Sequence, residues 1–499
     1  MNYISTRDIS PEKKKYQSAE AIKLGLASDG GLFIPDSIPQ VSNDFVAALA
    51  PLSYPERAKK VLELFLTDYS EAELVECCEK AYNDRSFVGG CAPMKKVNDS
   101  LYSLELWHGP TSAFKDMALQ IMPKLLSKAL VKTNEKRTAL ILVATSGDTG
   151  KAALEGYKDV EGVNIMVFYP NDGVSRVQKL QMASQTGENV NVCAIYGNFD
   201  DAQNGVKAIF SDKDFADVAN RKGVILSSAN SINWGRLVPQ VVYYFSAYCD
   251  LVAEGAISNG DKVNFCVPTG NFGNIFAAYI AKMMGLPVGK LICASNTNNV
   301  LTDFLQTGEY NRNRHFMSTI SPSMDILISS NLERLLSFIC GTEKTRAYMT
   351  ALAKDGVYKI DSEDLEKINE TFCGLWANEA ETAETIKNVY DTYGYLIDTH
   401  TAVAVKAAME YIDNANDGRI TVAVSTASPY KFAADVYASL GGEKPENDLD
   451  ALELLSGKTG VAIPYPLDGI ASREVRFTYS TEPSNMPEEV LAYIDSFAK

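Results

Sequence analysis

The sequence contains few of the residues that metal sites, disulfide frameworks and membrane segments require. It has only three histidines, His108, His315 and His400, and their wide separation leaves no neighbouring pair for a zinc site. The nine cysteines form no C-x-x-C pair, so we interpret them as reduced thiols that fill apolar space. No apolar run reaches about 18 residues, and the first 15 residues are polar and charged. We therefore expect a cytoplasmic protein without a metal, a membrane span or a secretory signal.

The overall composition is that of an ordinary globular protein. Hydrophobic residues make up 46% of the chain and charged residues 22%. The formal net charge of −16 argues against a nucleic-acid partner, which would normally need a basic face. The length of 499 residues suggests about three domains.

Short apolar segments alternate with helical patterns through most of the chain. Each segment is rich in Val, Ile or Leu and is bounded by turn residues, which is typical of buried strands. The predicted strands are Thr138–Ala144, Asn164–Tyr169, Asn191–Ile195, Val224–Ser227, Val263–Val267, Leu291–Ala294 and Ile420–Val424. This alternation predicts an α/β fold with parallel sheets covered on both faces. In such folds ligands bind at the carboxyl ends of the strands, so we look for function directly after each strand.

Two other regions show helical patterns. Residues 1–95 contain the amphipathic segments YPERAKKVLELFL and EAELVECCEKAY, and Gly89–Gly90 and Pro93 mark a boundary after them. Residues 362–392 are predicted to form another long helical region.

The segment HGPTSAFKDM, residues 108–117, places a lysine where a helix is predicted to begin. A turn at Gly109–Thr111 precedes Lys115, and an apolar stripe with helical spacing follows it from Ala118 to Ala129. The helix dipole disfavours a cation at this end, so the pKa of Lys115 should fall, as it must in a lysine that reacts with carbonyl compounds. Considered alone, the same residue is better described as an ordinary solvated lysine.

Three further loops follow predicted strands. ATSGDTG, residues 144–150, offers hydroxyls and N–H groups at a helix N-terminus, which suits an anion but also an ordinary helix cap. VPTGNFGN, residues 267–274, lets the backbone approach a phosphate, although a tight turn without a ligand has the same pattern. It is neither a dinucleotide fingerprint nor a P-loop. VSTASPYK, residues 424–431, offers Ser425 and Thr426 to a bound heterocycle.

Together these segments resemble the threonine synthase family, whose enzymes use pyridoxal 5'-phosphate (PLP). The resemblance covers nearly the whole chain and includes STRD (residues 5–8), LASDGGLFIP (26–35), GNFGN (270–274) and SANSINWGR (228–236). Its most specific motif is HGPTSAFKD, whose lysine bears PLP in the family. The sequence departs from the family at Ser428, where histidine is frequent, and at Asp148, where some relatives have asparagine and where a carboxylate would repel the cofactor's phenolate oxygen.

The resemblance implies a tryptophan synthase β-like fold (PLP fold-type II), with two parallel-sheet α/β domains and a helix-rich N-terminal domain. The predicted division is residues 1–95 for the N-terminal domain, 96–135 with 260–499 for the large PLP-binding domain, and 136–259 for the small domain. The implied reaction converts O-phospho-L-homoserine and water to L-threonine and phosphate. We expect a monomer or a homodimer.

The resemblance also assigns roles to individual residues. Lys115 would form the Schiff base with PLP, the backbone of Gly270, Asn271, Phe272, Gly273 and Asn274 would hold its phosphate, and Thr426 would face its pyridine nitrogen. For the substrate we expect Thr145, Ser146 and Thr149 at the carboxylate, and Arg236 with Asn233 at the phosphate. Lys151 and Arg176 are second choices for that phosphate.

Two alternatives to this reading remain open at this point. One is a related PLP enzyme, such as a serine or threonine dehydratase or a β-replacement synthase, which needs no second phosphate site. The other is a nucleotide-binding α/β protein without PLP.

Overall fold

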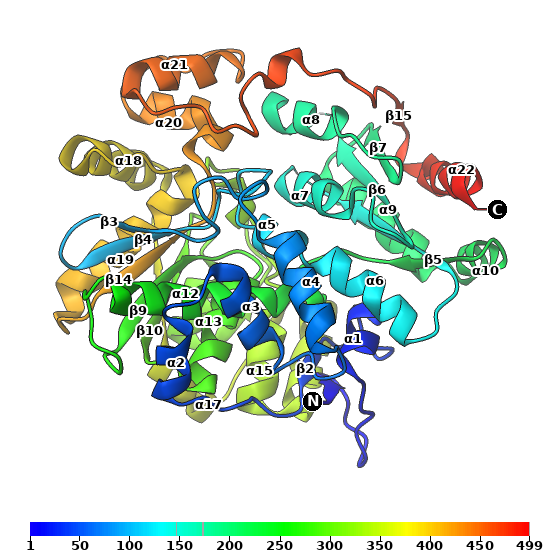
Figure 1. The fold of residues 1–499 in the computed structure, drawn as a ribbon, viewed down its shortest axis with the longest axis horizontal. Coiled ribbons are helices and arrows are strands. Elements are labelled where there is room, and N and C mark those ends of the chain that lie inside the picture. Colours follow the sequence, from blue (N-terminus) through cyan, green and yellow to red (C-terminus); the bar gives the residue numbers. More distant parts are fainter. Residues whose placement is uncertain (146, 172–173, 499) are drawn as a thin grey trace.

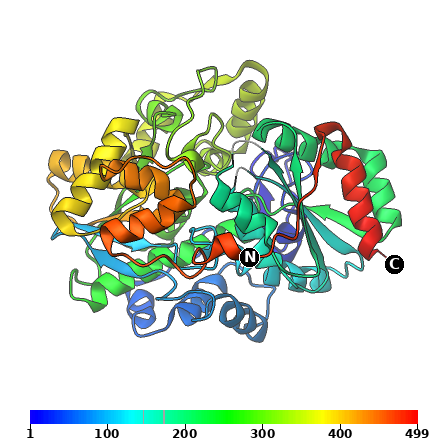
Figure 2. The same ribbon diagram turned by 90° about the horizontal axis from the view of Figure 1, so that it is seen from above.

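A computed structural model describes residues 1–145, 147–171 and 174–498. The chain folds into two lobes, each built mainly on a parallel sheet, and the N-terminal helices pack against helices of both lobes (Figure 1). Seen from above, the two lobes lie side by side (Figure 2).

The N-terminal region is helical, as predicted, and its helices begin at recognisable caps. Ser53 and Glu56 form a capping box at the start of α3, and Ser70 and Glu73 form another at α4. The elements of this region are β1 (Tyr3–Ser5), α1 (Ser18–Leu24), β2 (Phe33–Pro35), α2 (Asn43–Leu49), α3 (Tyr54–Leu62) and α4 (Glu71–Ala81).

The first sheet has the strand order β13-β10-β9-β14-β4-β3, in which only the β3–β4 pair is antiparallel. Its strands are β3 (Met94–Lys96), β4 (Leu101–Glu105), β9 (Val263–Pro268), β10 (Val288–Ser295), β13 (Phe372–Trp376) and β14 (Thr421–Ser425). The helices of this part of the chain are α12 (Pro239–Ala253), α13 (Gly273–Met284), α14 (Val300–Thr307), α15 (Leu332–Cys340), α16 (Thr342–Asp355), α17 (Ser362–Thr371), α18 (Glu379–Tyr393), α19 (Thr399–Ala415), α20 (Ala433–Ser439) and α21 (Asp450–Thr459). A separate two-stranded antiparallel sheet pairs β11 (Glu309–Asn311) with β12 (Val357–Lys359).

The second sheet has the order β15-β7-β6-β5-β8, and all its pairs are parallel. Its strands are β5 (Thr138–Ala144), β6 (Val163–Pro170), β7 (Val190–Ile195), β8 (Val224–Ser227) and β15 (Ser480–Thr481). The helices of this part are α5 (Asp116–Leu119), α6 (Met122–Lys132), α7 (Asp148–Tyr157), α8 (Arg176–Ala183), α9 (Phe199–Ser211), α10 (Lys213–Arg221), α11 (Trp234–Leu237) and α22 (Met486–Phe497).

Both faces of the second sheet are buried, which explains why its strands are continuously apolar. Leu140 and Leu142 of β5 pack in one hydrophobic cluster, while Ile141 and Val143 pack in another on the opposite face. Side chains alternate across a strand, so each face needs its own cover of helices. All seven predicted strands are present.

Two features differ from the sequence-based expectation. The helical region predicted over residues 362–392 is interrupted by β13, because Phe372–Trp376 pairs with β10 at the edge of the first sheet. The C-terminal β15 and α22 lie on the second sheet, although the predicted division counts them with the larger domain. The domain division itself stays a prediction.

Candidate functional site

Lys115 lies in the interior between the two sheets' carboxyl ends. Its Nζ atom is 3.5 Å from Asp148 Oδ2 and 3.5 Å from Ser323 Oγ, and the side chain is 10% exposed. Burial, opposed by the charge of Asp148, lowers the pKa of Lys115 below its usual value. The predicted direction is therefore correct, but its main cause is burial. The helix that follows, α5, has only four residues, and its dipole is correspondingly small.

Asp148 connects the two lobes through a buried charge network. Its Oδ1 atom accepts from Lys431 Nζ at 2.9 Å and from Gln178 Nε2 at 2.8 Å. Burial alone would raise the pKa of this carboxyl, but the charges of Lys431 and Lys115 hold it well below its usual value. Asp148 is thus an ionised partner of two lysines.

The loop after β9 presents free backbone donors at the start of α13. No hydrogen bond is made by the backbone N–H of Asn271, Phe272, Gly273 or Asn274 within the described part of the chain. Phe272 has a left-handed φ of 62°, a conformation that is costly for a residue with a Cβ and is enriched at ligand sites. Asn274 Nδ2 is buried without a partner there as well. This cluster of unpaired donors suits a phosphate.

The HGPTSAFKD and VSTASPYK segments are joined by backbone hydrogen bonds. The N–H of Phe114 donates to the carbonyl of Thr426 at 2.8 Å, and the N–H of Ser428 donates to the carbonyl of Ser112 at 3.0 Å. Thr426 is thereby held beside Lys115. The Ser428 hydroxyl accepts from the N–H of Tyr430 at 3.3 Å, which is a turn-forming role.

Asp116 accepts two hydrogen bonds within the HGPTSAFKD motif. Its carboxyl accepts from the N–H and from the hydroxyl of Thr111, at 2.8 and 2.7 Å. Burial raises the pKa of Asp116 to about 7, although these two hydrogen bonds oppose the shift. A Cβ on Gly109 would lie 2.5 Å from this carboxyl, so glycine is required there.

The ATSGDTG loop lies at the start of α7. The Thr145 hydroxyl accepts from the N–H groups of Gly147 and Gly150 at 3.0 and 2.9 Å, so it caps the helix and keeps only its own hydrogen for a ligand. Thr149 is half-buried. Ser146, the third predicted residue, lies outside the described residues.

The candidates for the substrate phosphate differ in how far they are already engaged. Arg236 is 6% exposed, donates to the carbonyl of Ala229 at 2.9 Å, and has no carboxylate in contact among the described residues. Burial lowers the pKa of Arg236 to about 10. The buried hydroxyl of the neighbouring Tyr157 also has no partner in the described part of the chain. Among the described residues, a buried cation without a carboxylate and a buried hydroxyl without a partner suit an anionic ligand.

The other candidates have structural partners. Asn233 caps α11 through Gly235 N–H at 2.9 Å and donates to the carbonyl of Ile22 at 2.9 Å, which leaves one amide hydrogen. Lys151 is paired with Glu155 at 3.1 Å.

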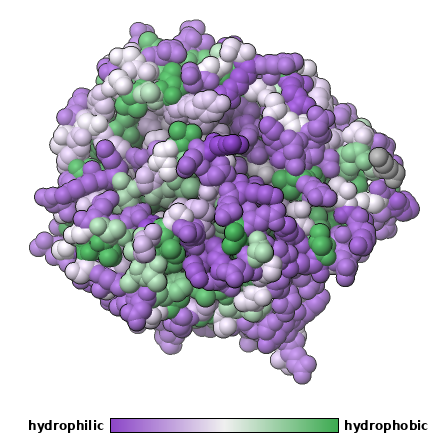
Figure 3. Space-filling model, viewed as in Figure 1, coloured by the Kyte–Doolittle hydropathy of each residue, from purple (hydrophilic) through white to green (hydrophobic). Residues whose placement is uncertain are grey.

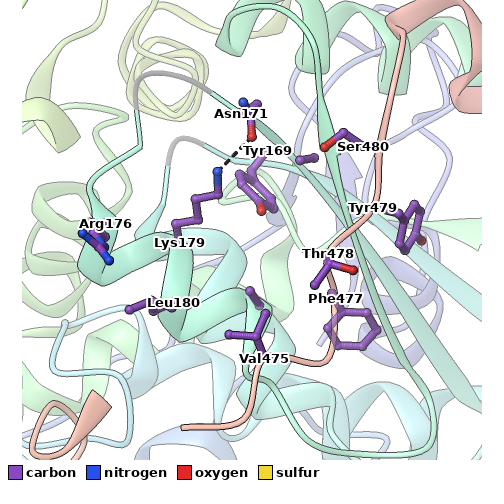
Figure 4. A pocket seen from close by; sticks show the side chains of 12 residues that line it. Tyr169, Asn171, Arg176, Lys179, Leu180, Val475, Phe477, Thr478, Tyr479 and Ser480 are labelled. Atoms are coloured by element: carbon purple, nitrogen blue, oxygen red, sulfur yellow. Dashed lines mark hydrogen bonds between the residues drawn. The ribbon is translucent and has the colours of Figure 1, made fainter. Parts of the chain in front are cut away.

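Arg176 lies outside the Lys115 site. Its side chain reaches Asn447 at 3.3 Å and lines a surface pocket of about 430 Å³ between α8 and the segment before β15 (Figure 4). In the same pocket Lys179 donates to Asn171 at 2.8 Å. The pocket contains neither Lys115 nor the loop after β9.

The site residues that were not predicted from sequence include Ser323, which contacts Lys115, His400, which accepts from the N–H of Ser323, and Lys431. Lys431 belongs to the VSTASPYK segment and is completely buried, so its place after a strand was an available signal. Ser323 and His400 follow no motif that could have indicated them. Among the described residues, no group of three or more His, Cys, Asp or Glu side chains is arranged to hold a metal ion.

No helix in the described ranges is both long and apolar enough to cross a bilayer. The face seen in Figure 3 is mainly hydrophilic, with apolar residues scattered among polar ones.

Known families match the chain along almost its entire length. The profile described as threonine synthase N terminus matches residues 2–82, the one described as pyridoxal-phosphate dependent enzyme matches 91–426, and the one described as threonine synthase, C-terminal, matches 401–494. The fold and the buried lysine site therefore define a member of the pyridoxal-phosphate dependent enzymes.

Individual relatives narrow this class. Threonine synthase of Pseudomonas aeruginosa is 39% identical over 448 residues, which are 89% of this chain and 92% of the relative. A PLP-bound threonine synthase structure from Brucella melitensis has 38% identity and a TM-score of 0.88, with 100% of both chains covered. The chain belongs to the threonine synthase family. The predicted fold class is confirmed, and PLP, the predicted cofactor, is the cofactor of this family.

Other relatives are longer proteins. Human threonine synthase-like 1 is 42% identical over 458 residues, which are 88% of this chain but 60% of that protein. The chain thus spans about 60% of the length of that relative.

Proposed function

We propose that this protein is a threonine synthase that converts O-phospho-L-homoserine and water to L-threonine and phosphate, with PLP attached to Lys115. The observation that carries this proposal is the buried guanidinium of Arg236, which has no carboxylate partner among the described residues. Its positive charge acts on Lys115, where it lowers the lysine's pKa after the larger effects of burial and Asp148. A phosphorylated substrate needs a second anion site close to the reactive lysine, whereas the substrate of a dehydratase does not.

The residues around Lys115 fit PLP. The N–H groups at Gly270–Asn274 and Asn274 Nδ2, which have no hydrogen-bond partner among the described residues, would hold the cofactor's phosphate at the N-terminus of α13. Thr426, held beside Lys115 by its bond to Phe114, would place its hydroxyl at the pyridine nitrogen. When bound, PLP withdraws electrons from the substrate carbon beside the amine and so permits loss of its proton.

The protein's own part is to move protons and to hold the two ends of the substrate. The amine of Lys115, once free, is tethered within reach of the substrate's Cα, Cβ and Cγ and can transfer protons at each. Its lowered pKa keeps a larger fraction of the amine neutral and therefore able to act as a base.

The substrate's carboxylate would bind at Thr145, Ser146 and Thr149, where a hydroxyl and the N-terminus of α7 converge. Its phosphate would bind Arg236, with the remaining amide hydrogen of Asn233 as a second donor. The negative charge on this phosphate grows as the Cγ–O bond breaks, so a buried guanidinium stabilises the transition state more than the bound substrate.

The proposal is tested by an assay for phosphate and threonine from O-phospho-L-homoserine. We expect both products in equal amounts from the wild-type holoenzyme. Release of ammonia and a keto acid from serine or threonine, without phosphate chemistry, would support the dehydratase alternative instead.

Arg236 is tested separately. Arg236→Ala should lower kcat/KM by about 10²- to 10³-fold, the cost of removing one donor to developing charge. Binding of a phosphate-free substrate analogue should change little, and the visible absorbance of the cofactor should remain. Arg221→Ala, at an exposed position on α10, is the matched control. An equal loss with both ligands would show that Arg236 does not bind the phosphate.

We also propose a cytoplasmic location and a monomeric or homodimeric state. All nine cysteines are free thiols in the structure, which suits a reducing compartment.

A further inference from the structure

A buried carboxylate–imidazole pair lies at the start of α19. Asp398 is fully buried and caps the helix, accepting from the N–H groups of His400 and Thr401 at 2.9 and 3.0 Å. The same carboxylate is 2.7 Å from His400 Nδ1. A carboxylate in this role only accepts, so Nδ1 carries the ring's proton and Nε2 keeps a free lone pair.

His400 Nε2 accepts a hydrogen bond from the backbone of a turn that is distant in the sequence. The N–H of Ser323 donates to His400 Nε2 at 3.0 Å. His400 is 2% exposed, and its ring lies against Phe432 with a centroid separation of 4.6 Å. The imidazole is therefore fixed on both nitrogens and on one face.

The Ser323 turn, residues 322–324, forms one wall of the lysine site. The Ser323 hydroxyl is 3.5 Å from Lys115 Nζ. The carbonyl of Ser323 lies 2.8 Å from the position that a Cβ on Gly270 would occupy. One turn thus contacts both the reactive amine and the loop that offers its N–H groups to a phosphate.

We propose that Asp398 and His400 are positioning residues that hold the Ser323 hydroxyl against the amine of Lys115. This inference rests on the proposed function of Lys115. A neutral amine has two hydrogens, and Asp148 Oδ2 and Ser323 Oγ are each 3.5 Å from its nitrogen. With one hydrogen directed to each oxygen, the lone pair is left in the one remaining direction, where it is free to accept a proton. The other charged groups that act on this amine are Arg236 and Lys431.

Two measurements on the 499-residue protein test this proposal. The first is kcat/KM of the holoenzyme. The second is the rate at which PLP attaches to the cofactor-free protein as a function of pH, whose midpoint reports the pKa of the Lys115 amine. Ser323→Ala removes an acceptor that favours the charged amine, so the midpoint should move to lower pH while kcat/KM falls by about tenfold.

The His400 variants show whether the histidine acts through Ser323. His400→Phe keeps a ring but removes the acceptor, and it should change both quantities as Ser323→Ala does. The double variant should be no worse than the more affected single one. His400→Gln keeps an acceptor near the place of Nε2 and should retain most of the wild-type behaviour. Ser318→Ala and His315→Gln, at exposed positions of the same loop, are the controls and should match wild type.

Several results would overturn the inference. One is a pH midpoint of PLP attachment and a kcat/KM that match wild type in either Ser323→Ala or His400→Phe. Another is a loss of kcat/KM in the double variant that equals the product of the two single losses. If His400→Phe does not fold, as judged by circular dichroism, the comparison of Ser323→Ala with Ser318→Ala still decides the role of the hydroxyl. If the wild-type protein makes no threonine, the proposed function fails, but the midpoints still test the contact between Ser323 and Lys115.

Discussion

Replacing Asp148 with asparagine removes the negative charge from the lysine network without changing the side chain's size. In the structure this carboxylate is 3.5 Å from Lys115 Nζ and 2.9 Å from Lys431 Nζ. Its charge raises the pKa of Lys115 against the larger effect of burial. In the variant, Lys115 would face only the positive charges of Lys431 and Arg236.

The size of the effect follows from Coulomb's law. Two unit charges about 3.5 Å apart interact by about 5 kcal/mol at an effective dielectric constant of about 20. Asp148→Asn removes this interaction, which favours the charged amine, and should therefore lower the pKa of Lys115 further. The variant should also lose about 3–5 kcal/mol of unfolding free energy, because Lys431 stays buried with Gln181 but without the carboxylate that balances its charge.

The assay is the rate of PLP attachment to the cofactor-free protein at a series of pH values, together with urea denaturation. The midpoint of the pH profile should fall in Asp148→Asn and stay in place in Asp413→Asn, an exposed aspartate on α19. A midpoint within half a unit of wild type would refute the reasoning, because it would mean that Lys115 does not experience the charge of Asp148.

Three further predictions concern the same site. Lys115→Ala should abolish the visible absorbance of bound PLP and turnover; absorbance that persists would place the attachment elsewhere. Gly270→Ala should weaken PLP binding more than Gly273→Ala does. A Cβ at position 270 would lie 2.8 Å from a backbone carbonyl, whereas at position 273 the nearest atom is 3.4 Å away. Equal PLP affinities of the two variants, measured by titration, would contradict this. The raised pKa of Asp116 gives stability that is complete below its unfolded value of 3.8 and is lost as the pH rises through about 7. The difference in unfolding free energy between wild type and Asp116→Asn should therefore decrease as the pH rises from 5 to 7. A difference that stays constant with pH in denaturation experiments would exclude this titration.

Local patterns in the sequence determined the strands, the N-terminal helices and the loops in which function was sought. Runs such as Thr138–Ala144 were recognisable because strands buried on both faces must be apolar at every position. Lys115 and the loop at Gly270–Asn274, which we propose bind the cofactor, were likewise selected from short motifs. Each is a contiguous segment whose pattern reflects its own backbone conformation.

Other features depend on contacts between distant segments. Residues 372–376 became a strand only because β10 offers them an edge, which overrides the helical pattern on either side. The sequence also does not reveal why the pKa of Lys115 is lowered, because the burial of the amine depends on all the segments that pack around it.

The remaining parts of the site are assembled by the fold alone. Ser323 and His400 are 77 positions apart, and Lys115 is 208 positions from Ser323. The turn at Ser323 nevertheless contacts both His400 and Lys115. The same holds for Lys431, whose buried amine neutralises Asp148 across the two lobes. Hydrogen bonds and ion pairs of this kind leave no periodic pattern in the chain, because their partners are chosen by position in space and not by spacing in the sequence.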